Sequence, residues 1–217
     1  MMQVHREIPQ LSSTIVTSGS FDGVHLGHQT ILSRLTELKR QHTGCETVVI
    51  TFHPHPRQVL KPDQKTLLLS TFSEKVKLLD AQGIDNLVVI PFTKEFSRTS
   101  SQAFIQNILI DSLDTQHLVI GYDHRFGHNR EGGFDYLQAH QDEYPFRIEE
   151  IPRQEIDESG ISSTKIREAL ANGQPEISNR YLGYTYSLTG KVVRGQQIGR
   201  TIGYPTANLE VLEENKL

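Results

Sequence analysis

The chain has 217 residues, enough to bury one substantial core and to begin a second domain. Its formal net charge of −4 excludes a global attraction to nucleic acid or to an anionic membrane, so an anionic ligand has to be held by local positive groups. One cysteine excludes an internal disulfide framework, and because no apolar run could span a bilayer and the N-terminus lacks a signal-peptide core, we expect a cytoplasmic protein.

Short runs of β-branched and apolar residues recur along the chain, and helix-like segments separate most of them. Strands are predicted at 14–17 (TIVT), 46–52 (ETVVITF), 86–92 (NLVVIPF), 117–121 (HLVIG) and 147–152 (RIEEIP). This alternation predicts a parallel sheet with right-handed crossovers, which is an α/β fold.

Two of the helices between these strands have recognisable start signals. Thr71 with Glu74 fits a capping box, and Gly83 follows as a stop signal. Thr99 with Gln102 fits a second box. Apolar residues follow each box at helical spacing: Val76, Leu78 and Leu79 after the first, and Phe104, Ile105 and Ile108 after the second.

The stretch 19–28 (GSFDGVHLGH) places three glycines and two histidines between the first strand and a helix. That helix is indicated by an apolar stripe of Ile31, Leu32, Leu35 and Leu38. Glycines allow a sharp turn and a close approach to a ligand, and a helix start offers free N–H groups. The pattern predicts an anion site at His25 and His28, although ordinary cap and surface residues would give the same spacing.

Four more histidines lie in two loops that each follow a predicted strand. His53 and His55 alternate with prolines in TFHPHPR, which suggests an extended rim, and His124 and His128 lie in GYDHRFGHNREGG. In an open parallel sheet, ligands bind outside the carboxyl ends of the strands, so these loops are expected to converge on one crevice. Solvated surface loops remain the alternative for both.

Residues 161–167 (ISSTKIR) combine hydroxyls and two cations at a helix start, an arrangement that suits phosphate, although a plain N-cap with solvated charges would look the same. A second short helix is expected after Pro175. Beyond Gly183 the pattern changes to an antiparallel-type strand at 186–195 and a turn-rich loop at 199–210. We therefore predict two domains, 1–182 and 183–217.

Five motifs occur along the chain in this order: GSFDGVHLGH, TFHPHPR, GYDHRFGHNREGG, ISSTKIR and GRTIGYPTANL. Together they resemble the bacterial bifunctional riboflavin kinase/FAD synthetase (FMN adenylyltransferase) family. The resemblance covers essentially the whole chain. The H-x-G-H element alone is widespread among nucleotidylyltransferases, but its combination with G-x-P-T-A-N is narrow. It implies an α/β, Rossmann-like nucleotidylyltransferase domain with a parallel sheet, followed by the start of an all-β riboflavin kinase barrel.

The resemblance also implies roles for individual residues. Catalytic roles fall to His25, His28 and Arg167. Nucleotide-binding roles fall to Gly19, Ser20, Phe21, Asp22, Gly23, His25, His28, Ser163, Thr164 and Arg167. Flavin-binding roles fall to His53, Pro54, Pro56, Arg57, Asp123, Arg125 and Phe126. Thr206 and Asn208 would bind the metal and nucleotide of the kinase. Ser20 is a departure, since many members have asparagine there.

The implied reaction is the transfer of AMP from ATP to FMN, giving FAD and pyrophosphate, with Mg²⁺ as cofactor. Riboflavin is the further substrate of the family's kinase, whose catalytic acid lies beyond the PTAN motif. We therefore expect this chain to lack that activity, and 195–217 to be poorly ordered or to lean on the first domain. Exposed strand edges there would favour self-association.

Three alternatives stay open. Another H-x-G-H nucleotidylyltransferase would not need the GRTIGYPTANL segment. A non-catalytic metal-binding protein using His53 and His55 predicts stoichiometric zinc and no nucleotide turnover. A flavin-storage protein predicts bound FMN or FAD without consumption of ATP.

Overall fold

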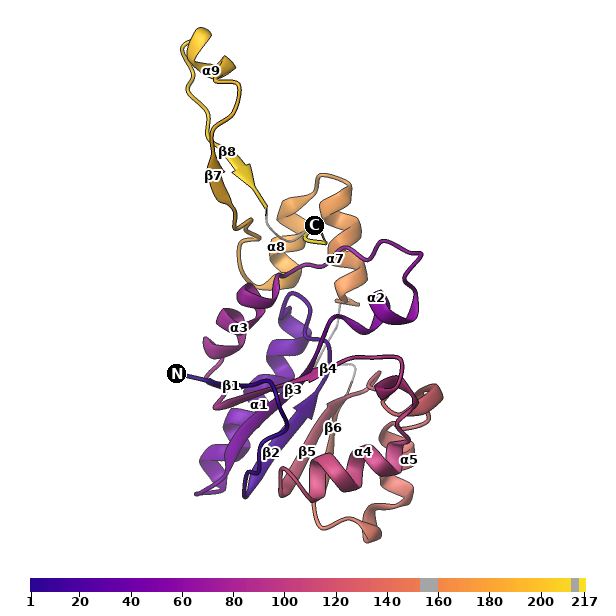
Figure 1. Cartoon of the computed structure of the whole chain (residues 1–217). Helices are drawn as coiled ribbons and strands as arrows, with labels where there is room; N and C mark the ends of the chain where they lie inside the picture. Colours follow the sequence, from indigo (N-terminus) through magenta and orange to yellow (C-terminus); the bar gives the residue numbers. More distant parts are fainter. Residues whose placement is uncertain (153–159, 212–214) are drawn as a thin grey trace.

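A six-stranded parallel sheet forms the centre of the computed structural model, which describes residues 1–152, 160–211 and 215–217 (Figure 1). The strand order is β1-β4-β3-β2-β5-β6, so the chain reverses its direction of winding between β2 and β5. The strands are β1 (Gln3–His5), β2 (Thr14–Ser18), β3 (Glu46–His53), β4 (Asn86–Pro91), β5 (Thr115–Gly121) and β6 (Arg147–Ile151). The α/β fold with a parallel sheet is confirmed.

All five predicted strands are present within two residues of the expected bounds, because strands buried on both faces show up as continuous apolar runs. β1 was not predicted. Three residues are too few to show a period, and this strand depends on long-range contacts: it pairs with β4, and the backbone N–H of Met2 donates to Asp80 at 2.7 Å.

Alternate residues of each strand pack into two hydrophobic cores, one on each face of the sheet. Ile15 of β2 packs with α1 (Leu26–Gln41) and with Leu79 of α3 (Phe72–Asp80). Val16 faces the opposite core, formed with α4 (Ser101–Phe104), η2 (Ile105–Ile110) and α5 (Phe134–Ala139). The predicted stripe of α1 is buried: Ile31, Leu32, Leu35 and Leu38.

One capping box is confirmed and the other is wrong. Thr71 accepts from the backbone N–H of Glu74 and Glu74 bonds back, as predicted. At the second site the N-cap is Ser100, whose hydroxyl accepts from the backbone N–H of Ala103 at 3.1 Å, and not Thr99. Three successive residues with side-chain hydroxyls lie there, so the sequence alone does not show which of them is the N-cap. The short α4 then continues as the π-helix η2.

After the sheet, α7 (Ser163–Ala171) and α8 (Pro175–Leu182) form a helical pair, with Ser162 as the N-cap of α7 and Gly183 in the left-handed C-cap of α8. The chain then forms a projecting antiparallel hairpin of β7 (Lys191–Val193) and β8 (Asn208–Glu210), with the short α9 (Ile198–Thr201) near its tip (Figure 1). The antiparallel strand is therefore much shorter than the predicted 186–195. The predicted loop contains a helical turn and a strand.

The hairpin and the residues just before it expose several large apolar side chains: Leu188, Val192, Ile198, Ile202, Tyr204 and Leu209. Residues 215–217 return to the first part of the chain, where Leu68 and Lys216 form an isolated parallel bridge. Among the described residues, no helix combines the length and apolar character that a membrane crossing would require.

Candidate nucleotide site

Loops distant in the sequence meet at the carboxyl edge of the sheet, where the winding reverses between β2 and β5. Such a reversal opens a crevice in parallel α/β sheets. Ser18 ends β2 and His124 follows β5, and the Ser18 Oγ and His124 Nε2 atoms lie 2.8 Å apart. We call residues 19–28 the histidine loop and residues 121–133 the mid-chain loop. The contact between Ser18 and His124 brings these two loops together, as expected for converging loops.

His25 and His28 form a stacked pair at the N-terminus of α1. The two ring centroids are 3.7 Å apart with an interplanar angle of 17°. His25 is the N-cap, and its Nδ1 accepts from the backbone N–H of His28 at 3.4 Å. The Phe21 ring lies 4.9 Å from the His28 ring. The pair is thus held at the end of the helix whose free N–H groups attract anions.

The surroundings of His28 favour the neutral form of its imidazole. Burial lowers its pKa well below the ordinary value, and the positive charges of His25 and Lys75 lower it further. No described residue hydrogen-bonds its buried Nδ1. A neutral imidazole with an unused ring nitrogen can donate one hydrogen bond to a phosphate oxygen, but it brings no positive charge.

Asp22 is a buried anchor of the histidine loop, with 1% of the residue exposed. Its carboxylate accepts from the backbone N–H groups of Leu69 and Ser70 at 3.0–3.1 Å, and from the Ser70 hydroxyl at 3.3 Å. Arg167 donates to the carboxylate Oδ2 at 2.6 Å, an oxygen that the Leu69 N–H also reaches. These donors occupy both oxygens of the carboxylate. Its contacts therefore hold the histidine loop against the backbone before α3 and against α7.

The ISSTKIR segment reaches the same loop from α7. Arg167 pairs with Asp22, its side chain is 17% exposed, and its buried Nε has no partner among the described residues. The Ser163 hydroxyl donates to the backbone carbonyl of Asp22 at 3.2 Å. Thr164 is exposed on the first turn of α7. The structure thus brings two of these three predicted residues to the histidine loop.

Lys75 is a cation of this site that the sequence reading missed. It lies on α3 with 7% of the residue exposed, and its Nζ donates to the backbone carbonyl of Ser20 at 2.7 Å. The Thr51 hydroxyl donates to the same carbonyl at 3.3 Å. The available signal was a lysine three residues after Phe72 and four before Leu79, on the apolar side of the helix.

The predicted rim at 53–57 is folded differently from an extended rim. His53 is exposed at the end of β3, and its ring lies 5.1 Å from that of Phe72. His55 is the N-cap of the short helix α2 (Pro56–Leu60), where its Nδ1 accepts from the backbone N–H of Arg57 at 3.1 Å. Pro56 opens this helix because its fixed φ suits the first helical position. The expectation of an extended rim is wrong from Pro56 onward, where the chain is helical.

His55 is half-buried and close to the Asp22 cluster. Burial lowers its pKa to about 4; the charge of Asp22 opposes this shift, and those of Lys75, Arg167 and Arg57 reinforce it. Pro54 and Arg57 lie on the exposed side of this turn. The turn after β3 therefore places His55 close to the charged groups around Asp22.

The other predicted flavin residues lie in the loop after β5. Asp123 is exposed, and Arg125 donates to the backbone carbonyl of His124 at 2.8 Å. Phe126 is 9% exposed and packs 5.4 Å from the Phe104 ring, with its backbone paired to Gly132. Phe126 is thus mainly a core residue.

Thr206 and Asn208 lie on the exposed hairpin, which extends away from the sheet (Figure 1). The Asn208 side chain covers Gly195, where a Cβ atom would come within 2.2 Å of its nitrogen. Within residues 1–152, 160–211 and 215–217, no group of three or more His, Cys, Asp or Glu side chains is placed to hold a metal ion.

A parallel sheet with paired histidines at a strand-to-helix turn, and with an arginine from a later helix bound to the same turn, defines a nucleotidylyltransferase-like α/β domain. Residues 7–165 match the FAD synthetase family and residues 182–217 match the riboflavin kinase family. The chain belongs to the FAD synthetase family, and its FAD synthetase domain is homologous to that of the bifunctional enzymes.

Curated relatives with the name bifunctional riboflavin kinase/FMN adenylyltransferase align with nearly the whole chain. The protein from Buchnera aphidicola subsp. Acyrthosiphon pisum is 35% identical over 95% of this chain and 65% of its own length. The protein from Listeria monocytogenes is 38% identical over 92% of this chain and 63% of its own length. The chain therefore spans slightly less than two thirds of these relatives.

A solved structure, described as a macrolide-efflux protein from Streptococcus pneumoniae, is also similar. It is 30% identical, with a TM-score of 0.86 over 97% of this chain and 68% of that one. The same fold therefore extends over nearly all of the present chain.

Proposed function

We propose that this chain transfers AMP from ATP to FMN, giving FAD and pyrophosphate. One observation carries the proposal: the stacked His25–His28 pair at the start of α1 and the Arg167 guanidinium converge on one glycine-rich loop. Membership of the FAD synthetase family supports ATP and FMN as the substrates.

The attacking group in this reaction needs no general base. A phosphate monoester such as that of FMN has a second pKa of roughly 6, so its oxygens are already largely ionised at neutral pH. The protein then has to hold this phosphate in line with the α-phosphorus of ATP and stabilise the charge that develops on the leaving pyrophosphate.

The residues around the loop divide this work. The α1 N-terminus and the neutral ring of His28 donate hydrogen bonds, and Lys75 and Arg167 supply positive charge. Asp22 orients Arg167, since the short ion pair fixes one edge of the guanidinium and leaves its other N–H groups for phosphate oxygens. Ser163 keeps the start of α7 close to the same loop.

Mg²⁺ fits this site as a companion of ATP. The Asp22 carboxylate is occupied by N–H and O–H donors, and Mg²⁺ commonly binds substrate phosphates while keeping several waters. When bound, the ion would neutralise charge on the polyphosphate. His25 and His28 would hold the same polyphosphate from the α1 side, together with the loop residues Gly19, Ser20, Phe21 and Gly23.

The flavin side is proposed for the loops that follow β3 and β5. His53, Pro54 and Arg57 are exposed at the carboxyl edge, and Asp123 and Arg125 are exposed beyond β5. The cations suit the FMN phosphate, and Phe126 and Pro56 are the apolar residues proposed to lie against the ring system.

We also propose that the chain divides after Leu182 into an adenylyltransferase domain and a riboflavin kinase segment. The change from parallel sheet to antiparallel hairpin and the family match over 182–217 support this division. Thr206 and Asn208 are proposed as kinase metal and nucleotide ligands. Since the described part of the segment contains a two-stranded sheet, we expect no conversion of riboflavin to FMN by this polypeptide. The exposed apolar side chains of the hairpin should favour self-association.

The test is to incubate the purified chain with Mg²⁺, ATP and either FMN or riboflavin, and to separate the flavin products by chromatography. FAD from FMN, and no FMN from riboflavin, is the expected result. Turnover of ATP with another acceptor and not with FMN would favour a different nucleotidylyltransferase. Stoichiometric zinc without turnover, or bound flavin without ATP consumption, would indicate a binding protein.

A further inference from the structure

The histidine loop has a backbone conformation that its own residues disfavour. Phe21 has a φ of 46° and Val24 a φ of 38°, both in the left-handed region, where a β-branched residue such as valine is rare. Gly23 lies between them with a φ of 77°, and a Cβ atom there would come within 2.9 Å of Leu69. Such conformations persist only where surrounding contacts determine them.

Three side chains outside this turn bind its backbone. The Gly23 N–H donates to the Ser70 hydroxyl at 3.0 Å, and the Gly23 carbonyl accepts from the Tyr184 hydroxyl at 2.5 Å. The Val24 carbonyl accepts from the Gln29 amide at 2.9 Å. The backbone N–H and the backbone carbonyl of Gly23 are therefore both held by side chains, and one of these, Tyr184, lies beyond Leu182.

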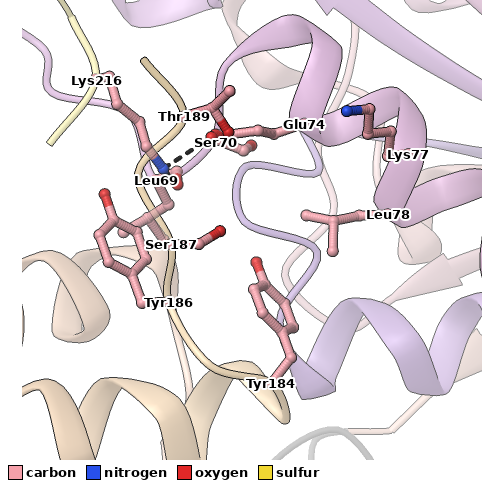
Figure 2. Close-up of a pocket in the computed structure, with 10 residues that line it drawn as sticks. All are labelled: Leu69, Ser70, Glu74, Lys77, Leu78, Tyr184, Tyr186, Ser187, Thr189 and Lys216. Carbon is pink, nitrogen blue, oxygen red and sulfur yellow. Dashed lines mark hydrogen bonds and ion pairs between the residues drawn. The ribbon is translucent and has the colours of Figure 1, made fainter. Parts of the chain in front are cut away.

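Tyr184 belongs to the segment that matches riboflavin kinase, two residues after α8 ends. Figure 2 shows it beside Leu78 of α3, in the wall of a pocket of about 260 Å³ that Tyr186 and Lys77 also line. Burial raises the pKa of the Tyr184 hydroxyl, so the group stays protonated and keeps donating. The Gln29 amide also donates to the Leu182 carbonyl at 2.8 Å, which ties the end of α8 to the same turn.

A second contact from the kinase segment reaches the loop through Leu69. The Leu69 N–H donates to Asp22, and its carbonyl accepts from Lys216 Nζ at 2.5 Å. Lys216 also pairs with Glu74 at 3.1 Å. The segment that follows α8 therefore contacts the turn directly through Tyr184, and Lys216 binds Leu69, the residue whose N–H holds Asp22.

We propose that Tyr184 is a positioning residue for ATP binding, acting through Gly23 from within the riboflavin kinase segment. This inference rests on the proposed function, since it takes the histidine loop as the ATP site. Without the hydroxyl, the Gly23 carbonyl loses its donor, and the strained turn can relax toward conformations that displace His25 and His28. The adenylyltransferase site is then completed by residues beyond its own family match, which ends at residue 165.

The test compares Tyr184→Phe with Tyr186→Phe. Tyr186 lines the same pocket, but its hydroxyl donates to the Leu217 carbonyl and not to the loop, so it is a matched control. We measure the Kd of a non-hydrolysable ATP analogue and of FMN by calorimetry, the KM for ATP, and the Tm. Tyr184→Phe should weaken binding of the analogue about tenfold, the effect of losing one buried hydrogen bond, and leave FMN binding unchanged. Tyr186→Phe should bind both as the wild type does.

An unchanged analogue Kd in Tyr184→Phe, or an equal loss in Tyr186→Phe, would overturn the inference. If Tyr184→Phe does not fold, Ser70→Ala removes the acceptor of the Gly23 N–H; it must weaken analogue binding for the inference to stand. Because the Kd needs no turnover, a wild-type chain that binds ATP but makes no FAD refutes the proposed function and leaves the role of Tyr184 to be decided by these binding measurements.

Discussion

Arg167 Nη2 lies 2.6 Å from Asp22 Oδ2, so a residue of α7 and a residue of the first βα loop form one buried ion pair. The same carboxylate binds the backbone of Leu69 and Ser70, which precede α3. Three segments distant in sequence are therefore fixed around one carboxylate, next to the two histidines.

Asp22→Asn should destabilise the protein and abolish most activity. The amide keeps the shape of the side chain but loses the negative charge, so Arg167 is left buried without its partner. Breaking a buried pair in this way costs about 3 kcal/mol in the free energy of unfolding. Urea unfolding and FAD formation measure the two effects. Asp142→Asn, at an exposed aspartate, is the control and should match the wild type; equal stability in the two variants would contradict the anchoring role.

His28→Ala should slow FAD formation far more than it weakens FMN binding, because the lost contact is to the departing phosphates and not to the flavin. Removing one preorganised donor of this kind lowers turnover on the order of a hundred- to a thousandfold. Steady-state kinetics gives kcat, and fluorescence quenching gives the FMN Kd. A kcat within a few-fold of wild type would refute the assignment.

Lys75→Met should raise the KM for ATP about tenfold while the fold is retained. Methionine replaces the buried stem of the lysine, but it cannot donate to Ser20 or face a polyphosphate with positive charge. Lys77→Met is the matched control, since this neighbouring lysine is exposed on the same helix. If both variants have the ATP affinity of the wild type, Lys75 has a packing role alone.

Stability should fall as the pH drops from 7 to 5. His28, His55 and His117 have pKa values lowered chiefly by burial, so below the ordinary value of 6.5 the unfolded chain binds protons that the folded chain does not. For His55 this loss extends from 6.5 down to its folded pKa of about 4.

The check on this pH dependence is the Tm measured at intervals between pH 8 and pH 5. His55→Asn should flatten the dependence, because asparagine can also cap α2 but does not titrate in this range. His128→Asn, at an exposed histidine, should leave the slope unchanged. A Tm independent of pH across this range in the wild type would show that these histidines titrate alike in the folded and unfolded chains.

The sheet and the approach of the loops could be predicted because they follow from local patterns. Strands such as 46–52 show a run of β-branched and apolar residues that is buried from Thr47 to Thr51. The carboxyl-edge rule places the loops after β2 and β5 together, where Ser18 lies next to His124. The histidine pair was signalled by flanking glycines. These inferences need no knowledge of which side chains pair across the fold.

The remaining features depend on pairings that the sequence does not reveal. The partners of Asp22 come from Leu69, Ser70 and Arg167, and nothing local marks a carboxylate as a backbone anchor. Lys75 could not be predicted for the same reason, because its place in the site depends on a hydrogen bond to the distant Ser20 carbonyl. His55 became a helix cap through the adjacent Pro56, which a reading of alternating histidines and prolines missed.

The most direct measurement of adenylyl transfer follows the phosphorus atoms of ATP. The wild-type chain is incubated with Mg²⁺, FMN and ATP labelled at either the α- or the γ-phosphorus, and the products are separated by thin-layer chromatography. The account predicts that the α label appears in FAD and the γ label in pyrophosphate. Transfer of the γ label to a flavin, or no labelled flavin from either form of ATP, would contradict it.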